Sequence, residues 1–231
     1  MVCRHNYRAE IKVYEKSDDI ISKMHCREDN MADRLKIKAD ELIGALNELD
    51  AVKSCTLYGS LAAGTHDALS DIDIEVDVSG FDNGKFMLEL PKLLKGKIDI
   101  YYVDFAPSLI PERYIVSIAV DDENPFMMAD LCCRAEPHCA TVTRQDAAER
   151  NGKHTHMLKL WTANLKHYVR GADCRNDITR MAQKLGISVA ETKTEVDILS
   201  ETLRWLEVNA DAALEKYMVS CRRRFEELKN T

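Results

Sequence analysis

Acidic and aliphatic residues alternate strictly from Asp71 to Val78, in the order DIDIEVDV. Successive side chains of a β-strand point to opposite faces, so this order predicts a strand with its carboxylates on one face and its aliphatic side chains on the other. Like charges on one strand face repel each other, and a purely structural strand rarely accepts that. Divalent cations such as Mg²⁺ take oxygen ligands and would remove the repulsion. The pattern therefore predicts a strand that holds metal.

Gly59 and Ser60 follow an apolar stretch that is typical of a buried strand. A Gly-Ser turn after a strand lets backbone N–H groups point outward, and the hydroxyl adds a donor, so the turn suits phosphate oxygens. Thr65, after a second break at Gly64, is a further candidate phosphate contact. A phosphate-binding turn followed by two carboxylates spaced i and i+2 indicates metal-assisted phosphoryl or nucleotidyl transfer.

These motifs resemble the DNA polymerase beta-like nucleotidyltransferase superfamily, whose signature is Gly-Ser, a spacer of about this length, then Asp-aliphatic-Asp-aliphatic. The superfamily has a third metal-site carboxylate on a later strand. The stretch KIDIYYV, from Lys97 to Val103, resembles that strand and puts Asp99 in the matching position. The resemblance implies two Mg²⁺ ions and a nucleoside triphosphate as co-substrate. The residues expected to be catalytic and to bind metal are Asp71, Asp73 and Asp99. The residues expected to bind the nucleotide are Gly59, Ser60 and Thr65.

The resemblance implies transfer of a nucleoside monophosphate, AMP from ATP, to a hydroxyl group with release of pyrophosphate. Three carboxylates are candidates for the general base: Asp99, Asp130 and Glu136. Asp104 is expected to cap a loop at the end of the third strand. Glu75 and Asp77 lie further along the metal-binding face and are expected to face solvent or to support the metal ligands.

The fold expected is α/β (α+β): a mixed-sheet nucleotidyltransferase domain over residues 1–145, then a helical bundle over residues 146–231. Amphipathic patterns predict a helix at 30–49 with Asn30 as its N-cap and four helices after Thr143. Weaker patterns predict an edge strand at 8–14 and a short helix at 17–26. Strands are expected at 52–58, 71–78 and 97–104, with further strands or buried segments at 115–120 and 127–135. The layout resembles the aminoglycoside and lincosamide nucleotidyltransferases, which implies a small-molecule acceptor and a role in antibiotic resistance.

The net charge of −7 over 231 residues argues against a nucleic-acid partner. The sequence shows no apolar leader and no long apolar run, so a cytoplasmic location without membrane association is expected. The eight cysteines form no Cys-x-x-Cys pair, which favours reduced thiols over a zinc site. Two alternatives stay open, namely a protein-modifying, antitoxin-type nucleotidyltransferase and a non-catalytic nucleotide-binding regulator. The sequence leaves open the acceptor, the preferred nucleotide and the oligomeric state.

Overall fold

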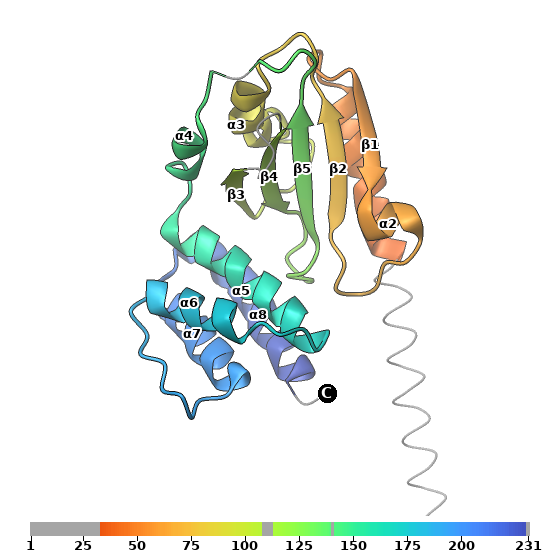
Figure 1. Ribbon diagram of the computed structural model, residues 1–231. Coiled ribbons are helices and arrows are strands. Elements are labelled where there is room, and N and C mark those ends of the chain that lie inside the picture. The colour runs from red at the N-terminus through yellow and green to blue at the C-terminus, as the bar shows by residue number, and fades with distance from the viewer. Residues whose placement is uncertain (1–32, 108–112, 140, 230–231) are drawn as a thin grey trace, which may run out of the picture.

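The computed structural model describes residues 33–107, 113–139 and 141–229. A β-sheet forms the upper part of the molecule and a group of helices forms the lower part (Figure 1). The strand expected at 8–14, the helix expected at 17–26 and the cap at Asn30 lie outside the described residues. Within the described ranges, every helix is too short or too polar to cross a lipid bilayer.

The sheet has five strands in the order β1-β2-β5-β4-β3. Its members are β1 (Ser54–Tyr58), β2 (Ile72–Asp77), β3 (Tyr102–Pro107), β4 (Arg113–Ala119) and β5 (Met128–Arg134). β2 pairs with β1 in the antiparallel sense and with β5 in the parallel sense, so the sheet is mixed as expected. The parallel pairing inserts β5 beside β2, although the chain forms two other strands between them.

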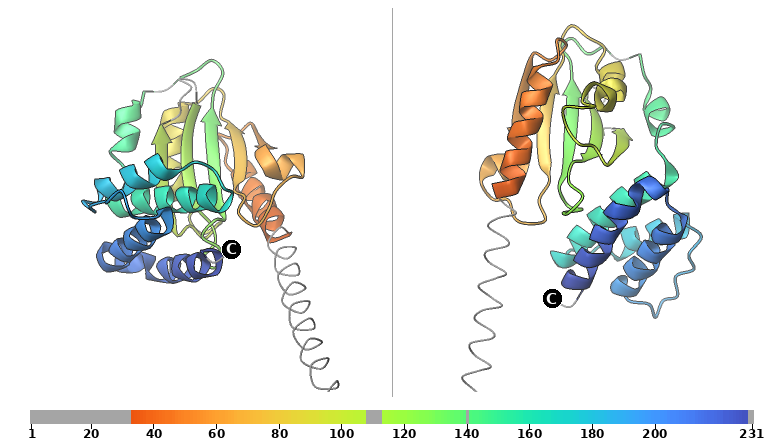
Figure 2. Two further views of the ribbon diagram at one scale, coloured as in Figure 1. Left: turned by 60° about the horizontal axis from the view of Figure 1, so that its bottom comes forward. Right: turned by 180° about the vertical axis from the view of Figure 1, so that it is seen from behind.

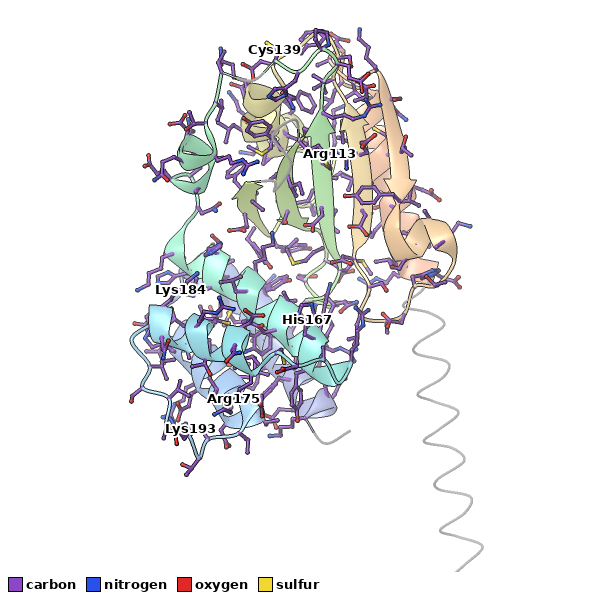
Figure 3. The ribbon with its side chains drawn as sticks, in the orientation of Figure 1. Arg113, Cys139, His167, Arg175, Lys184 and Lys193 are labelled. Carbon is purple, nitrogen blue, oxygen red and sulfur yellow. The ribbon has the colours of Figure 1, made fainter. Side chains whose placement is uncertain are left out.

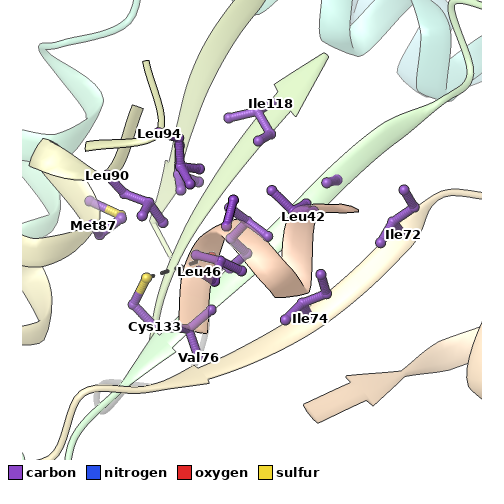
Figure 4. Close-up of a cluster of buried hydrophobic side chains, with 14 of the residues drawn as sticks. Leu42, Leu46, Ile72, Ile74, Val76, Met87, Leu90, Leu94, Ile118 and Cys133 are labelled. Atoms are coloured by element: carbon purple, nitrogen blue, oxygen red, sulfur yellow. Dashed lines mark hydrogen bonds between the residues drawn. The ribbon is translucent and has the colours of Figure 1, made fainter. Parts of the chain in front are cut away.

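Two helices cover one face of the sheet. They are the helix over residues 33–47 and α3 (Asn83–Leu93), and the first lies in front of the strands when the molecule is seen from behind (Figure 2). Ile72, Ile74 and Val76 of β2 are fully buried under them. Figure 4 shows these side chains among Leu42 and Leu46 of the first helix. Because side chains alternate along β2, its carboxylates must lie on the opposite face.

The C-terminal half is helical. It contains α4 (Arg144–Ala148), α5 (Lys153–Val169), α6 (Arg175–Lys184), α7 (Glu195–Asn209) and α8 (Glu215–Leu228). Trp161 of α5 is fully buried and meets Phe225 of α8 edge-on, with ring centroids 5.9 Å apart. The expected fold class, a mixed sheet with a C-terminal group of packed helices, is therefore confirmed. The cysteines that the structure describes are all free thiols.

The sheet and the helices share a hydrophobic core. Tyr102 and Met128, at the lower end of the sheet, and Phe126, in the loop before β5, pack in one cluster with the buried side chains of α5 to α8. The Tyr217 hydroxyl of α8 donates a hydrogen bond of 2.7 Å to the carbonyl of Pro125, in the loop between β4 and β5. The helices are therefore fixed to the lower edge of the sheet, with α5 nearest to it (Figure 1).

The third strand differs from the prediction. It begins at Tyr102 rather than at Lys97, because the chain turns at Gly96, which has φ of +82°, and Lys95 and Ile98 make an isolated bridge. Asp99 therefore precedes the strand. Asp104 lies inside the strand and is 1% exposed, so it does not cap a loop.

Candidate active site

A row of polar residues crosses four neighbouring strands. The register places Asp73 of β2 beside Asp130 of β5, Asp130 beside Ser117 of β4, and Ser117 beside Asp104 of β3. Residues paired in this way project to the same face, and here that is the face away from the two covering helices. Because neighbouring strands lie about 4.8 Å apart, the carboxylates of Asp73 and Asp130 can contact one cation.

The carboxyl group of Asp73 has an unfavourable environment for its charge. Burial, together with the carboxylates of Asp71 and Asp130, raises its pKa to about 6, against the lowering effect of Lys166. Asp130 accepts a hydrogen bond from the Ser117 hydroxyl. A raised carboxyl pKa between two other carboxylates is the electrostatic condition that a divalent cation relieves.

Gly59 lies directly against Asp73. Its φ is +70°, and a Cβ atom built there would lie 2.1 Å from Oδ2 of Asp73. Any other residue would therefore clash with the carboxylate, which explains why glycine is needed at this turn. Ser60 follows Gly59 in the short helix α2 (Gly59–Ala63). Thr65 is exposed, and its backbone N–H donates to the carbonyl of Ser60 at 3.0 Å.

Cationic side chains of helix α5 lie along the lower edge of the sheet. Nζ of Lys166 lies 3.1 Å from Oδ2 of Asp71, and Arg170 pairs with Asp67 at 2.7 Å. At the other end of the helix, Nδ1 of His156 lies 2.9 Å from the buried carboxylate of Asp104. Lys159 reaches the same carboxylate at 3.6 Å.

The sequence prediction missed this cationic row, because it used α5 for its apolar stripe alone. The signal was present, since Lys159, Lys166 and Arg170 are spaced seven and four residues apart and so share one face of a helix. The amide of Asn151 positions the start of α5. It both donates to and accepts from the backbone of Phe105 in β3, at 2.8 and 2.6 Å.

Asp99 does not join the carboxylate row, contrary to the expectation. It is exposed and precedes β3, which lies three strand spacings from β2, about 14 Å away. Asp130 lies beside Asp73 instead. Glu136 is also distant, because it follows the far end of β5 and pairs there with Arg134 at 3.1 Å. Of the three candidate bases, Asp130 is the one that lies beside the other carboxylates.

Glu75 and Asp77 are paired rather than directed freely to solvent. Nε of Arg134 lies 2.6 Å from Glu75, and Nη2 of the same side chain lies 3.1 Å from Asp77. Arg113 adds a contact of 3.4 Å to Glu75. Figure 3 shows Arg113 over the upper part of the sheet, well above the C-terminal helices.

The donor set suits a hard divalent cation, because Asp71, Asp73 and Asp130 offer carboxylate oxygens from two adjacent strand ends. Among the residues that the structure describes, no three Asp, Glu, His or Cys side chains are arranged to hold an ion as they stand. Asp71 is directed to Lys166 and Asp130 to Ser117. The residue types therefore fit a metal, while two of the carboxylates are engaged elsewhere.

Comparison with known families finds a match to one part of the chain. Residues 39–123 match the family model of the nucleotidyltransferase domain, a range that contains Gly59, Ser60, Asp71 and Asp73. No curated protein matches the chain.

Several solved structures resemble the chain at low similarity. A GLD-2/RNP-8 complex is 17% identical, with a TM-score of 0.34 over 90% of this chain and 66% of that one. Cid1 in complex with the UTP analogue UMPNPP is 14% identical, with a TM-score of 0.34 over 82% and 53%. The non-canonical poly(A) polymerase complex GLD-2–GLD-3 is 18% identical, with a TM-score of 0.34 over 85% and 59%. The chain thus spans between 53% and 66% of the length of these structures.

The family match covers the Gly-Ser turn and the Asp-x-Asp strand that the sequence pattern singled out. Residues 39–123 are therefore similar to the nucleotidyltransferase domain family.

Proposed function

We propose that this protein is a metal-dependent nucleotidyltransferase that transfers AMP from ATP to a hydroxyl group of a small molecule. The observation that carries the proposal is the pairing of Asp73 with Asp130 across β2 and β5, with Gly59 packed against Asp73. This geometry supports a site for Mg²⁺ and phosphate on the open face of the sheet.

In this proposal Asp71, Asp73 and Asp130 hold Mg²⁺, and Asp130 takes the place first expected for Asp99. When bound, Mg²⁺ neutralises phosphate charge and increases the acidity of a hydroxyl that it contacts. The backbone N–H groups at Gly59 and Ser60, the Ser60 hydroxyl and the ammonium of Lys166 bind the triphosphate oxygens. Thr65 is exposed beyond the short helix α2, so its proposed contact with phosphate lies at the edge of the site.

The acceptor side follows from the stereochemistry of the reaction. In an in-line displacement the attacking hydroxyl approaches opposite the leaving pyrophosphate. If Gly59 and Lys166 bind the pyrophosphate, the acceptor lies on the other side of Asp130, over β4 and β3. The polar groups there are the Ser117 hydroxyl and His156, whose ring is oriented by the buried carboxylate of Asp104. Asp130, between the two sides, is the proposed base.

The charge of the protein supports a small acceptor. The net charge of −7 disfavours long phosphate backbones, whereas it attracts compact or cationic acceptors that carry hydroxyl groups. Aminoglycosides and lincosamides have this chemistry, and a role in antibiotic resistance would follow from such an acceptor.

The test is a transfer assay with the four α-³²P-labelled ribonucleoside triphosphates and Mg²⁺. The acceptors are kanamycin, lincomycin and an oligoadenylate RNA, with Asp73→Asn as the control for metal-dependent transfer. Label from ATP on kanamycin or lincomycin, absent in the control, supports the proposal. Label on the RNA alone would overturn the small-molecule acceptor. Nucleotide binding without any transfer or pyrophosphate release would favour the non-catalytic regulator.

A further inference from the structure

The ammonium of Lys166 is almost fully buried, since its side chain is 8% exposed. Its partner, Oδ2 of Asp71 at 3.1 Å, belongs to a side chain that is 40% exposed. A buried ammonium is costly unless a carboxylate compensates it. Burial and the neighbouring carboxylates raise the pKa of Asp73, and Lys166 lowers it. Its positive charge therefore acts on two of the three carboxylates that are proposed to hold metal.

This placement accounts for the arrangement of the carboxylates. Asp71 is directed to Lys166, and no three acidic side chains of the described residues converge on one point. An ammonium at Asp71 would repel a divalent cation at the same carboxylate, because two positive charges a few ångströms apart interact strongly in a partly buried site. The Lys166 ammonium and a divalent cation therefore cannot both lie at Asp71 without a large electrostatic cost.

We propose that Lys166 is a resident cation at Asp71 that a divalent metal must displace, after which the freed ammonium turns to the triphosphate. This inference rests on the metal site of the proposed function. Helix α5 need not move, because Arg170 remains bound to Asp67 and the lysine stem has four rotatable bonds. Lys166 thereby acts as a positioning residue that couples the binding of metal to the binding of nucleotide, and the coupling is reciprocal.

The experiment measures Mn²⁺ binding to the full chain without nucleotide, from the electron paramagnetic resonance signal of free Mn²⁺. Lys166→Met should bind Mn²⁺ about tenfold more tightly than the wild type, because the competing charge is gone. Lys166→Arg keeps the charge and should bind like the wild type, within about twofold. Lys159→Met is the matched control, since it removes another α5 lysine paired with a buried carboxylate, that of Asp104. It should leave Mn²⁺ affinity unchanged.

A second readout uses a non-hydrolysable ATP analogue. In the wild type the analogue should tighten Mn²⁺ binding, and in Lys166→Met this increase should shrink because the exchange no longer contributes. Equal or weaker Mn²⁺ binding by Lys166→Met, with melting curves that show a folded protein, would overturn the inference, as would a failure of both proteins to bind. Asp73→Asn separates the two proposals. If it binds Mn²⁺ like the wild type, the metal lies elsewhere and the proposed site itself has failed.

Discussion

Strand β2 presents carboxylates along one face, but its two ends have different neighbours. At the lower end Asp73 is in register with Asp130, and burial together with the charges of Asp71 and Asp130 raises the pKa of Asp73. At the upper end Asp77 is in register with Arg134, which also binds Glu75. One alternating pattern thus supplies a pair of adjacent carboxylates at one end and an ion-paired cluster at the other. The residue on β5 decides which of them is a candidate site, and the acidic strand alone does not.

Substitutions at the two ends of β2 are expected to differ most in the rate of nucleotidyl transfer. Asp73→Asn should lower the rate of transfer by about 100-fold or more, because each 1.36 kcal/mol of transition-state stabilisation corresponds to a factor of ten. Glu75→Gln, two residues along the same face, should stay within about threefold of the wild type, since its partner Arg134 is structural. Pyrophosphate release measures both. Equal losses in the two variants would show that the two ends do not differ.

The second comparison concerns the third carboxylate. Asp130→Asn should lower transfer by about 100-fold, because Asp130 lies beside Asp73 and is the proposed base. Asp99→Asn should stay within about twofold of the wild type, since Asp99 is exposed and precedes the edge strand β3. The same pyrophosphate assay decides. Loss of activity in Asp99→Asn alone would restore the assignment that the sequence suggested.

The third test concerns the approach of Gly59 to Asp73. Gly59→Ala should destabilise the protein by about 2–3 kcal/mol and lower transfer at least tenfold, because its Cβ would lie 2.1 Å from the carboxylate at a positive φ. Gly64→Ala has nearly the same φ, +69°, with no atom within 4 Å of the new Cβ. It should cost about 1 kcal/mol from backbone strain and leave transfer intact. Urea unfolding gives the free energies. Similar transfer rates in the two variants would show that the close contact is not needed.

The pKa of Asp73 gives a prediction for stability against pH. The folded state, with a pKa of about 6, holds its proton more tightly than the unfolded chain, with the ordinary value of 3.8. The wild type therefore loses stability as the pH rises from 3.8 to about 6, and the loss is complete above this range. Asp73→Asn should be more stable by about 1–2 kcal/mol at pH 8, after allowance for solvent screening, and no more stable at pH 4. Urea unfolding without metal measures this, and an equal gain at both pH values would exclude the charge as its cause.

The smallest effect is expected at the upper cluster. Arg134→Met should destabilise the protein by about 1 kcal/mol, because Glu75 and Asp77 lose a partly exposed partner. Transfer should stay within about twofold. Adding Asp77→Asn should recover part of the stability, since it removes one of the two like charges, those of Glu75 and Asp77, that repel each other. A large loss of transfer in Arg134→Met would mean that the upper cluster belongs to the site.

Local pattern was sufficient for β2 and for the turn at Gly59, because the alternation and the Gly-Ser break are specific to short segments. It failed for Asp99, because KIDI alternates as β2 does while Gly96 and the bridge at Ile98 turn the chain before the strand begins. Asp130 was identified as a candidate base but not as the partner of Asp73. β5 is largely buried on both faces, so its sequence shows no alternation that marks the residue.

The order of the strands could not be predicted from the sequence either. The parallel pairing of β5 with β2 is a long-range contact between segments more than fifty residues apart in the chain. The same holds for the contact between Lys166 and Asp71, which are 95 positions apart. Contacts of this kind depend on the packing of α5 against the edge of the sheet, which no local spacing encodes.

The core that Tyr102, Phe126 and Met128 share with the C-terminal helices determines how the protein unfolds. Removal of the helices would expose this buried apolar surface, so we expect a fragment cut at about residue 145 to be unstable. Heating should accordingly produce a single cooperative transition, seen alike by far-ultraviolet circular dichroism and by tryptophan fluorescence. Both tryptophans, Trp161 and Trp205, lie in the helical part, so the fluorescence reports on the helices while the dichroism reports on the whole chain.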